Sequence, residues 1–185
     1  MPRIPGSVRI GAAWALAVPF LIFSRPTPAA LAVGAVLAAA GLLVRAWAAG
    51  SIDKSRTLTT SGPYAHTRNP LYLGSFLVGV GLAVAGGHWI WPTAFTALFL
   101  VVYVPTMRDE ARTLHGLFGE RYAEYAASVP AFVPMFVPRA TPHRADPPGA
   151  THFYWARYLD HREWEALLGT GAALGILAIK MVLWG

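Results

Sequence analysis

Residues 70–104 read PLYLGSFLVGVGLAVAGGHWIWPTAFTALFLVVYV, and they contain two apolar segments without a charged residue. The segments cover 70–86 and 89–104, and only Gly87 and His88 separate them. A helix needs about 20 residues, at about 1.5 Å each, to cross the roughly 30 Å of hydrocarbon in a bilayer. Two apolar stretches of nearly that length with so short a connection predict a tight antiparallel helical hairpin within a membrane.

Three further apolar segments flank this hairpin. Residues 8–23 are the shortest and contain Pro19, which kinks a membrane helix without ending its span. A cleaved signal peptide is the alternative for this segment, because a basic stretch precedes a brief apolar core, and we interpret it as a retained span. Residues 28–48 hold one charge, Arg45, close enough to the end to extend toward the interface, and residues 165–184 end the chain. The sequence therefore predicts an all-α polytopic membrane protein with about five transmembrane helices.

The composition agrees with this fold class. Of the 185 residues, 55% are hydrophobic and 13% are charged, against about 25% charged in soluble domains. No cysteine is present, which excludes disulfides, thiolate zinc sites, iron–sulfur clusters and a cysteine nucleophile. The net charge is +6, and in so apolar a chain a basic balance favours cytoplasmic loops over a nucleic-acid surface. We expect residues 1–185 to form a single integral membrane domain whose partner is the bilayer.

The basic residues predict the orientation. If the N-terminus is cytoplasmic, thirteen of them lie on the cytoplasmic side, and only Arg25 and Lys180 lie on the other. Because cytoplasmic segments are enriched in Lys and Arg, we expect the N-terminus inside and the C-terminus outside a cell inner membrane. Both long segments, 49–69 and 105–164, then face the cytoplasm. The thirteen are Arg3, Arg9, Arg45, Lys54, Arg56, Arg68, Arg108, Arg112, Arg121, Arg139, Arg144, Arg157 and Arg162.

The second long segment begins with an amphipathic pattern. Apolar residues recur at helical spacing between Arg108 and Pro130, so we expect a helix that continues from the fourth span along the membrane interface and stops at Pro130. Its apolar positions are Leu114, Leu117, Phe118, Tyr122 and Tyr125. Six prolines from Pro130 to Pro148 then prevent regular structure up to about His152, where an aromatic run leads into the last span.

No motif of a soluble nucleotide-binding fold is present. The sequence lacks a Gly-x-Gly-x-x-Gly after a strand, a phosphate loop and a Gly-x-Ser-x-Gly elbow. Its six histidines show no paired ligand spacing on one helix face, so we expect no metal site.

Two polar clusters are predicted at the same membrane face, and the first is residues 62–74, GPYAHTRNPLYLG. Here a Gly-Pro turn precedes Arg68, and Asn69 and Pro70 stand at the start of the third span. In a structural interpretation Asn69 caps this helix and Pro70 takes its first position. In a functional interpretation the helix N-terminus beside Arg68 binds a carboxylate or phosphate. Both interpretations stay open.

The second cluster is residues 107–112, MRDEAR, where the fourth span leaves the membrane. A solvated junction in which Asp109 pairs with Arg112 is one interpretation. The other is a binding site, because acids at a helix C-terminus oppose the helix dipole and need a cationic partner. An anion-binding helix end facing Asp109 and Glu110 suits a zwitterionic or cationic ligand.

Three blocks occur in order within residues 62–134. They are Gly62-Pro63-Tyr64-x-x-x-Arg68-Asn69-Pro70-x-Tyr72-x-Gly74, then Asp109-Glu110, then Phe118-Gly119-Glu120-x-Tyr122-x-x-Tyr125-x-x-x-Val129-Pro130-x-Phe132-x-Pro134. Together they resemble the isoprenylcysteine carboxyl methyltransferase family and its phospholipid methyltransferase relatives. The chain departs from that family at Asn69, where histidine is usual, and at Asp109, where glutamate is common.

The resemblance implies a methyltransferase that uses S-adenosylmethionine as its cofactor. The resemblance implies cofactor binding by Tyr64, Arg68, Pro70, Tyr72 and Glu110. Further candidate cofactor-binding residues are Asn69, Asp109 and Tyr122. Glu110 and Arg108 are the candidate catalytic residues, and Glu110 either orients the cofactor's amino group or takes a proton from an amine acceptor. A carboxylate acceptor needs no base, and the faces of Tyr72 or Tyr122 suit a sulfonium cation.

The acceptor is expected to be a lipophilic small molecule or a lipid-linked group that enters from the bilayer. The candidate substrate residues at its entrance are Arg157, Arg162, Glu163 and Trp164. A collar of interfacial side chains is the alternative for these four. Farther along, the spacing of Gly171 and Gly175 predicts close helix packing.

Two other function classes fit a chain of this kind. A membrane reductase with a nicotinamide cofactor has a similarly polar cytoplasmic end, but it requires an adenine-ribose-phosphate site that the sequence does not display. A transport or scaffold protein is expected to carry ionisable residues in mid-span, whereas Arg45 and Lys180 lie near the ends of their spans.

Overall fold

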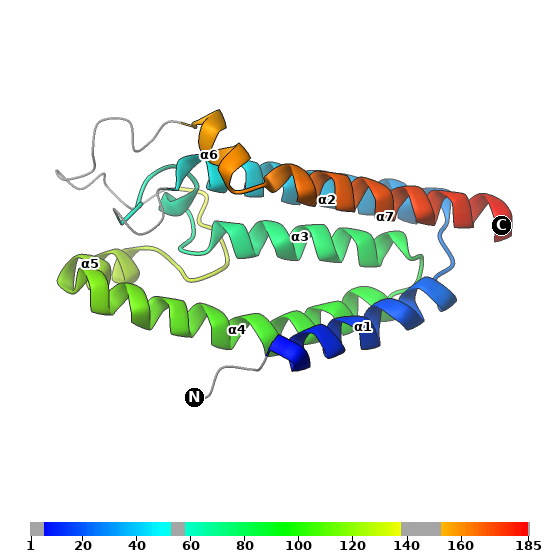
Figure 1. Cartoon of the computed structure of the whole chain (residues 1–185), viewed down its shortest axis with the longest axis horizontal. Helices are drawn as coiled ribbons and strands as arrows, with labels where there is room; N and C mark the ends of the chain where they lie inside the picture. Colours follow the sequence, from blue (N-terminus) through cyan, green and yellow to red (C-terminus); the bar gives the residue numbers. More distant parts are fainter. Residues whose placement is uncertain (1–5, 53–57, 138–152, 185) are drawn as a thin grey trace. The chain divides into compact units, whose positions relative to one another are not determined.

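The computed structural model describes residues 6–52, 58–137 and 153–184. Over these ranges the chain is helical without a strand, as the sequence predicts (Figure 1). The predicted irregular stretch over 138–152 and the basic residues Arg3, Lys54, Arg56, Arg139 and Arg144 lie outside the described residues. The elements are α1 (Gly6–Phe23), α2 (Pro28–Ser51), the 3-10 helix η1 (Gly62–Ala65), α3 (Pro70–Ala85), α4 (Ile90–Phe118), α5 (Glu120–Ser128), α6 (Trp155–Asp160) and α7 (Glu163–Trp184).

Five of these helices correspond to the five predicted spans. By length and composition, α2, α4 and α7 are long and apolar enough to cross a membrane, with 24, 29 and 22 residues. Gly11–Phe23 and Pro70–Ala85 are apolar but shorter. The helix α4 continues beyond residue 104 to Phe118, which confirms the predicted continuation of the fourth span.

The chain divides into two compact units. The first comprises Met1–Gly41, Phe76–Arg108 and Leu167–Gly185, and the second comprises Leu42–Ser75 and Asp109–Ala166. The helices α2, α3, α4 and α7 therefore contribute residues to both units.

In the first unit, the predicted turn between the third and fourth spans forms at Gly86 and Gly87. Their amides donate to Ala83 O and Val84 O at 3.1 and 3.0 Å, and Gly86 O accepts from the amide of Arg25 at 2.9 Å. Gly87 has a φ of +79°, and a Cβ there would lie 2.0 Å from Arg25 O. Only glycine fits so close an approach with this backbone conformation.

Close helix packing in the first unit occurs between α2 and α3. A Cβ on Gly81 would lie 2.6 Å from both Ala38 N and Gly34 O, so the absence of side chains lets the two backbones approach. The sequence prediction of close packing at Gly171 and Gly175 is wrong for the described chain, because a Cβ on either would meet nothing within 4 Å. Spacing alone does not determine which face of α7 lies against a neighbouring helix.

Lys180 of α7 holds the C-terminal end of α1 within the same unit. Its ammonium donates to Leu21 O at 2.6 Å, Ile22 O at 3.0 Å and Ser24 Oγ at 3.1 Å. These three bonds use every donor of the ammonium, and a cation at a helix C-terminus is favoured by the helix dipole.

The core of the second unit confirms most of the predicted amphipathic pattern. Leu58, Tyr122, Tyr125 and Val129 form a buried cluster, whereas Leu117 is 66% exposed. Residues that pack against this cluster are Ala111, Leu114, Phe118 and Ala126.

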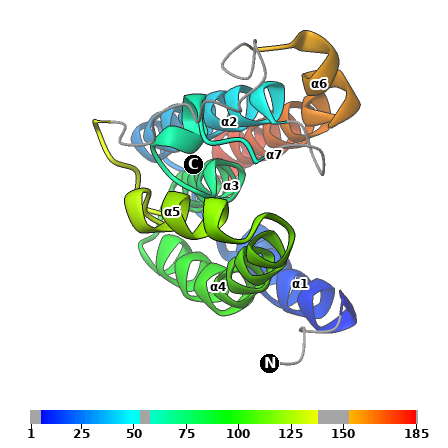
Figure 2. The same cartoon turned by 90° about the vertical axis from the view of Figure 1, so that its left-hand side faces the viewer.

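The predicted helix up to Pro130 is interrupted at Gly119. This glycine has a φ of +56°, so the chain ends α4 at Phe118 and starts α5 at Glu120 (Figure 2). The amphipathic pattern continues across the interruption, which is why the sequence alone does not reveal the change of direction.

Candidate functional site

The first polar cluster folds around η1 in the second unit. Gly62 begins η1 with a φ of +60° and Pro63 follows at its start. This places Tyr64 in the interior, where the side chain is 7% exposed. The Tyr64 hydroxyl is buried and has no hydrogen-bond partner in the described structure. Buried polar atoms without a partner are rare in folded proteins, and each one needs an explanation.

Two of the three sequence blocks lie against each other. Residues 66–69, which precede α3, exchange six hydrogen bonds with residues 130–135, which follow α5. These bonds join the chain before α3 to the chain after α5, so the blocks of the sequence resemblance form one structural element. They are Arg68 N to Pro130 O, Met135 N to His66 O, His66 Nδ1 with Met135 O, Thr67 Oγ1 to Ala131 O and to Phe132 O, and Asn69 Nδ2 to Ala131 O.

Asn69 has a defined contact in this element. Its side-chain amide donates to Ala131 O at 2.8 Å. The residue that departs from the resembled family therefore helps to hold the two blocks together. The next residue, Pro70, is buried at the first position of α3, as predicted, and Tyr72 is half-buried.

Arg68 is brought to α5. Its NH1 group donates to the hydroxyl of Tyr122 at 3.3 Å, while its Nε is buried without a partner in the described structure. Tyr122 is 5% exposed. Tyr125, one turn later, donates its hydroxyl to the main-chain oxygen of Tyr64 at 2.7 Å. The structure thus brings together Tyr64, Arg68 and Tyr122, three of the residues proposed from the sequence.

Burial keeps the two tyrosines protonated, because it raises the pKa of both phenols. The pKa of Tyr64 is raised first by burial and then by Tyr125 and by the charges of Glu110 and Glu163. Burial also raises the pKa of Tyr125, against a lowering effect of Arg68. A phenol that stays neutral keeps its hydrogen, so the free Tyr64 hydroxyl is available as a donor.

The two acids of the second cluster are placed differently. Asp109 accepts a hydrogen bond from Arg112 at 3.0 Å on the surface, which confirms the pairing that its spacing predicts. Glu110 is exposed, and its charge acts on Tyr64. Arg108 is exposed and belongs to the first unit.

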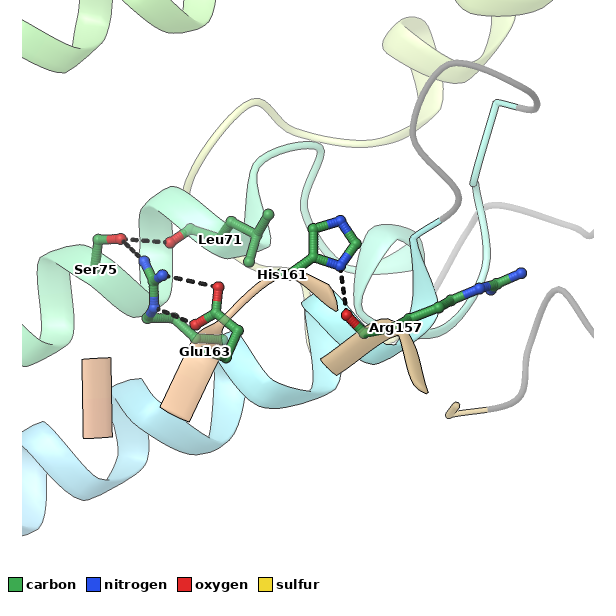
Figure 3. Close-up of polar contacts among 6 residues, drawn as sticks. Leu71, Ser75, Arg157, His161 and Glu163 are labelled. Atoms are coloured by element: carbon green, nitrogen blue, oxygen red, sulfur yellow. Dashed lines mark hydrogen bonds and ion pairs between the residues drawn. The ribbon is translucent and has the colours of Figure 1, made fainter. Parts of the chain in front are cut away.

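Glu163, a candidate substrate residue, is 7% exposed and engaged in an ion pair. Arg45 of α2 donates to it through both Nε and NH2, at 2.9 Å each (Figure 3). The prediction that Arg45 extends toward the interface is therefore wrong, because Glu163 holds the guanidinium inside the protein. The sequence offered only one indication of this ion pair, a cation near the end of one apolar segment and an acid at the start of another.

The other candidate substrate residues lie around α6. Arg157 lies 4.6 Å from the ring centroid of Tyr154, and its NH1 donates to Ser51 O at 3.4 Å. Arg162 pairs with Glu165 and lies 5.8 Å from the ring centroid of Trp164. The side chains of Arg162 and Trp164 are exposed, at 67% and 41%. Apart from the bond between Arg157 and Ser51 at the end of α2, these contacts are local to the chain around α6.

A comparison with protein families decides the identity of the chain. The family model described as phospholipid methyltransferase matches residues 29–121, half of the chain. The chain belongs to the phospholipid methyltransferase family. This membership confirms the resemblance carried by the three blocks, of which two lie within the matched range and the third overlaps its end. As a member of this family with three helices long and apolar enough to cross a bilayer, the chain is an integral membrane protein.

Three curated relatives match this family member over 76 to 106 residues. The chain is 33% identical over 106 residues to the cobalt-zinc-cadmium resistance protein CzcN of Cupriavidus metallidurans, covering 56% of this chain and 49% of the relative. It is 28% identical over 78 residues to a protein-S-isoprenylcysteine O-methyltransferase of Schizosaccharomyces pombe, covering 42% and 33%. A Xenopus laevis enzyme of the same name is 33% identical over 76 residues, covering 41% and 26%.

The chain matches less than half the length of each of these relatives, 49% at most. No solved structure matches the chain significantly.

Proposed function

We propose that this member of the phospholipid methyltransferase family transfers a methyl group from S-adenosylmethionine to a lipophilic acceptor at the cytoplasmic face of the membrane. The single observation that carries the proposal is a pair of buried atoms, Tyr64 Oη and Arg68 Nε, that have no hydrogen-bond partner among the described residues. Both lie in the sequence block for which the family resemblance implies cofactor binding. Leaving buried donors unpaired costs about 1–3 kcal/mol each, which a polar ligand would offset.

The chemistry of these residues fits the proposed cofactor. S-adenosylmethionine supplies a methyl group activated by a sulfonium, together with an ammonium and a carboxylate. We assign the carboxylate to the guanidinium of Arg68 and the ammonium to Glu110, with the Tyr64 hydroxyl as a further donor. The aromatic faces of Tyr72 and Tyr122 suit the sulfonium. Asn69 and Pro70 shape the backbone beside Arg68, and Asp109 stays a peripheral candidate.

Catalysis in this proposal consists of positioning. Methyl transfer from a sulfonium is an in-line displacement that needs no metal, so the chain has to hold donor and acceptor in line and exclude water. A carboxylate acceptor needs no base. For an amine acceptor, Glu110 is the candidate to take the proton. Arg108, the other catalytic candidate, stays protonated and can contribute only its positive charge at the helix exit.

The acceptor and the orientation rest on the sequence. The apolar helices favour a lipid or a lipophilic small molecule, with Arg157, Arg162, Glu163 and Trp164 as the candidates near its entrance. The thirteen-to-two distribution of basic residues favours a cytoplasmic site and an inner-membrane location. Reporter fusions at both termini test the orientation, for which we expect a cytoplasmic N-terminus and an external C-terminus.

A binding experiment tests the proposed function. Purified protein in detergent is titrated calorimetrically with S-adenosylmethionine, with its demethylated product S-adenosylhomocysteine and with a reduced nicotinamide. We expect micromolar binding of the first two and none of the third. Heat with the nicotinamide alone would favour the membrane reductase, and no heat with any of them would favour a transport or scaffold protein.

A further inference from the structure

The ion pair between Arg45 and Glu163 is saturated. Arg45 Nε and NH2 donate to the two oxygens of Glu163, and Arg45 NH1 donates to Ser75 Oγ. Ser75 Oγ in turn donates to Leu71 O at 2.8 Å, as Figure 3 shows. The two charged side chains are 24% and 8% exposed. Each guanidinium nitrogen and each carboxylate oxygen has a partner, so the pair has little capacity left to bind a ligand directly.

Stability alone does not account for such a pair. Taking two charges out of water costs free energy that their attraction only partly restores, and apolar residues of similar size often serve as well. Removing one partner, in contrast, leaves a buried charge that is not compensated. We therefore look for a role of the Arg45–Glu163 pair in the charge balance of its surroundings.

The pair lies beside the candidate cofactor site. Ser51 lies in the last turn of α2, and a Cβ on Gly62 of η1 would lie 3.6 Å from its Oγ. The 3-10 helix η1 therefore packs on the end of α2, the helix that carries Arg45. Ser75, which Arg45 contacts, follows Tyr72 by three residues and lies on the same face of α3. The charge of Glu163 also acts on Tyr64.

Glu110 is the other carboxylate whose charge acts on Tyr64. Among the residues that the structure describes, no cation forms an ion pair with Glu110. The two acids therefore differ, because Arg45 compensates the charge of Glu163, whereas Glu110 has no ion pair over the described ranges.

We propose that Arg45 sets the charge of the cofactor site by neutralising Glu163, while Glu110, to which we assign the cofactor's ammonium, has no ion pair in the described part of the chain. This inference rests on the proposed function. One free carboxylate matches the single ammonium of the cofactor. A second would hold the sulfonium too tightly relative to the neutral thioether product, and a free Arg45 would repel the sulfonium. The pair thereby determines how strongly the site distinguishes the charged donor from its uncharged product.

The test measures the ratio of the Kd of S-adenosylhomocysteine to that of S-adenosylmethionine. Arg45→Gln frees the charge of Glu163, so we expect the ratio to rise at least about threefold. Glu163→Gln frees the charge of Arg45, so we expect it to fall by a similar factor. The double variant has neither charge, and its ratio should return to within about twofold of the wild-type value.

Two controls separate charge from structural damage. Arg45→Lys keeps the charge but loses the forked geometry, so it should keep the wild-type ratio even if stability falls. Lys180→Gln removes a cation whose bonds hold α1, so it should lower the melting temperature without changing the ratio.

The test depends on the two single variants changing the Kd ratio in opposite directions. If both weaken the two ligands equally, the pair is only a structural clamp and the proposal is overturned. If a single variant does not fold, the double variant and Arg45→Lys still decide, because a change of more than about threefold in either ratio overturns the proposal. Absence of binding to the wild-type protein would instead contradict the proposed function itself.

Discussion

The hydroxyl of Tyr125 donates to the main-chain oxygen of Tyr64 at 2.7 Å, while the hydroxyl of Tyr64 itself has no partner in the described structure. Both side chains are buried, at 7% exposure each. The Tyr125 hydroxyl holds η1 against α5, whereas the Tyr64 hydroxyl has no described hydrogen-bond partner. Removing one or the other should therefore have different consequences.

Tyr125→Phe should lower the stability of the protein. The substitution leaves the buried main-chain oxygen of Tyr64 without its hydrogen-bond donor, so we expect the free energy of unfolding to fall by about 1–3 kcal/mol. Denaturant titration in mixed micelles measures this change. Tyr158→Phe is the matched control, because no described hydrogen bond involves that hydroxyl, and it should change the value by less than about 0.5 kcal/mol. Equal losses in the two variants would contradict the role of the Tyr125 bond.

Tyr64→Phe should lower the affinity for the cofactor without lowering the stability of the protein. The substitution removes a buried hydroxyl that forms no hydrogen bond with any described residue, so stability should be unchanged or slightly higher. Affinity for S-adenosylhomocysteine should fall about threefold to tenfold, the usual effect of one neutral hydrogen bond. Unfolding and calorimetric titrations of the same preparation measure both quantities. Reduced stability with unchanged affinity would show that Tyr64 is a structural residue.

The two neighbouring acids of α4 should not be equivalent. Glu110→Gln should weaken binding of S-adenosylmethionine by about 1.5–3 kcal/mol, or roughly tenfold to a hundredfold, the value of a charge-assisted hydrogen bond. Asp109→Asn should change it by less than about twofold, because Asp109 already pairs with Arg112 on the surface. Calorimetry on both variants measures the difference. Equal effects, or no effect of either, would remove Glu110 from the site and leave the fold unchanged.

Two glycines of apolar helices should respond differently to alanine. Gly81→Ala places a Cβ 2.6 Å from backbone atoms of α2, so we expect a loss of about 1–3 kcal/mol from overpacking. Gly175→Ala meets nothing within 4 Å and should be neutral or stabilising by up to about 1 kcal/mol, because alanine favours the helix. Unfolding in mixed micelles compares them. Similar losses at both positions would mean that α7 packs closely through Gly175.

The sequence predicts those features of this chain that depend on local pattern. Apolar stretches of helical length predict α2, α4 and α7, and a proline and a glycine pair mark where α3 begins and ends. Periodicity also identifies Tyr122 and Tyr125 as core residues. Each of these depends on neighbours within a few turns of a helix.

Contacts between distant residues could not be predicted in the same way. Arg45 and Glu163 are separated by 118 positions, and a cation near a span end is equally compatible with extension toward the interface. All six bonds between residues 66–69 and 130–135 end on a main-chain oxygen, which carries no sequence signal. The free hydroxyl of Tyr64 is likewise visible only once its surroundings are known.

Transfer of a labelled methyl group tests the central claim most directly. Membranes containing the protein are incubated with S-adenosylmethionine tritiated in its methyl group, and label is counted in the organic extract. We predict label above that of membranes without the protein, a loss of at least about tenfold in Arg68→Met, and no loss in the surface control Arg112→Met. Label equal to that of membranes without the protein, or equal in the wild-type and Arg68→Met proteins, would contradict this account.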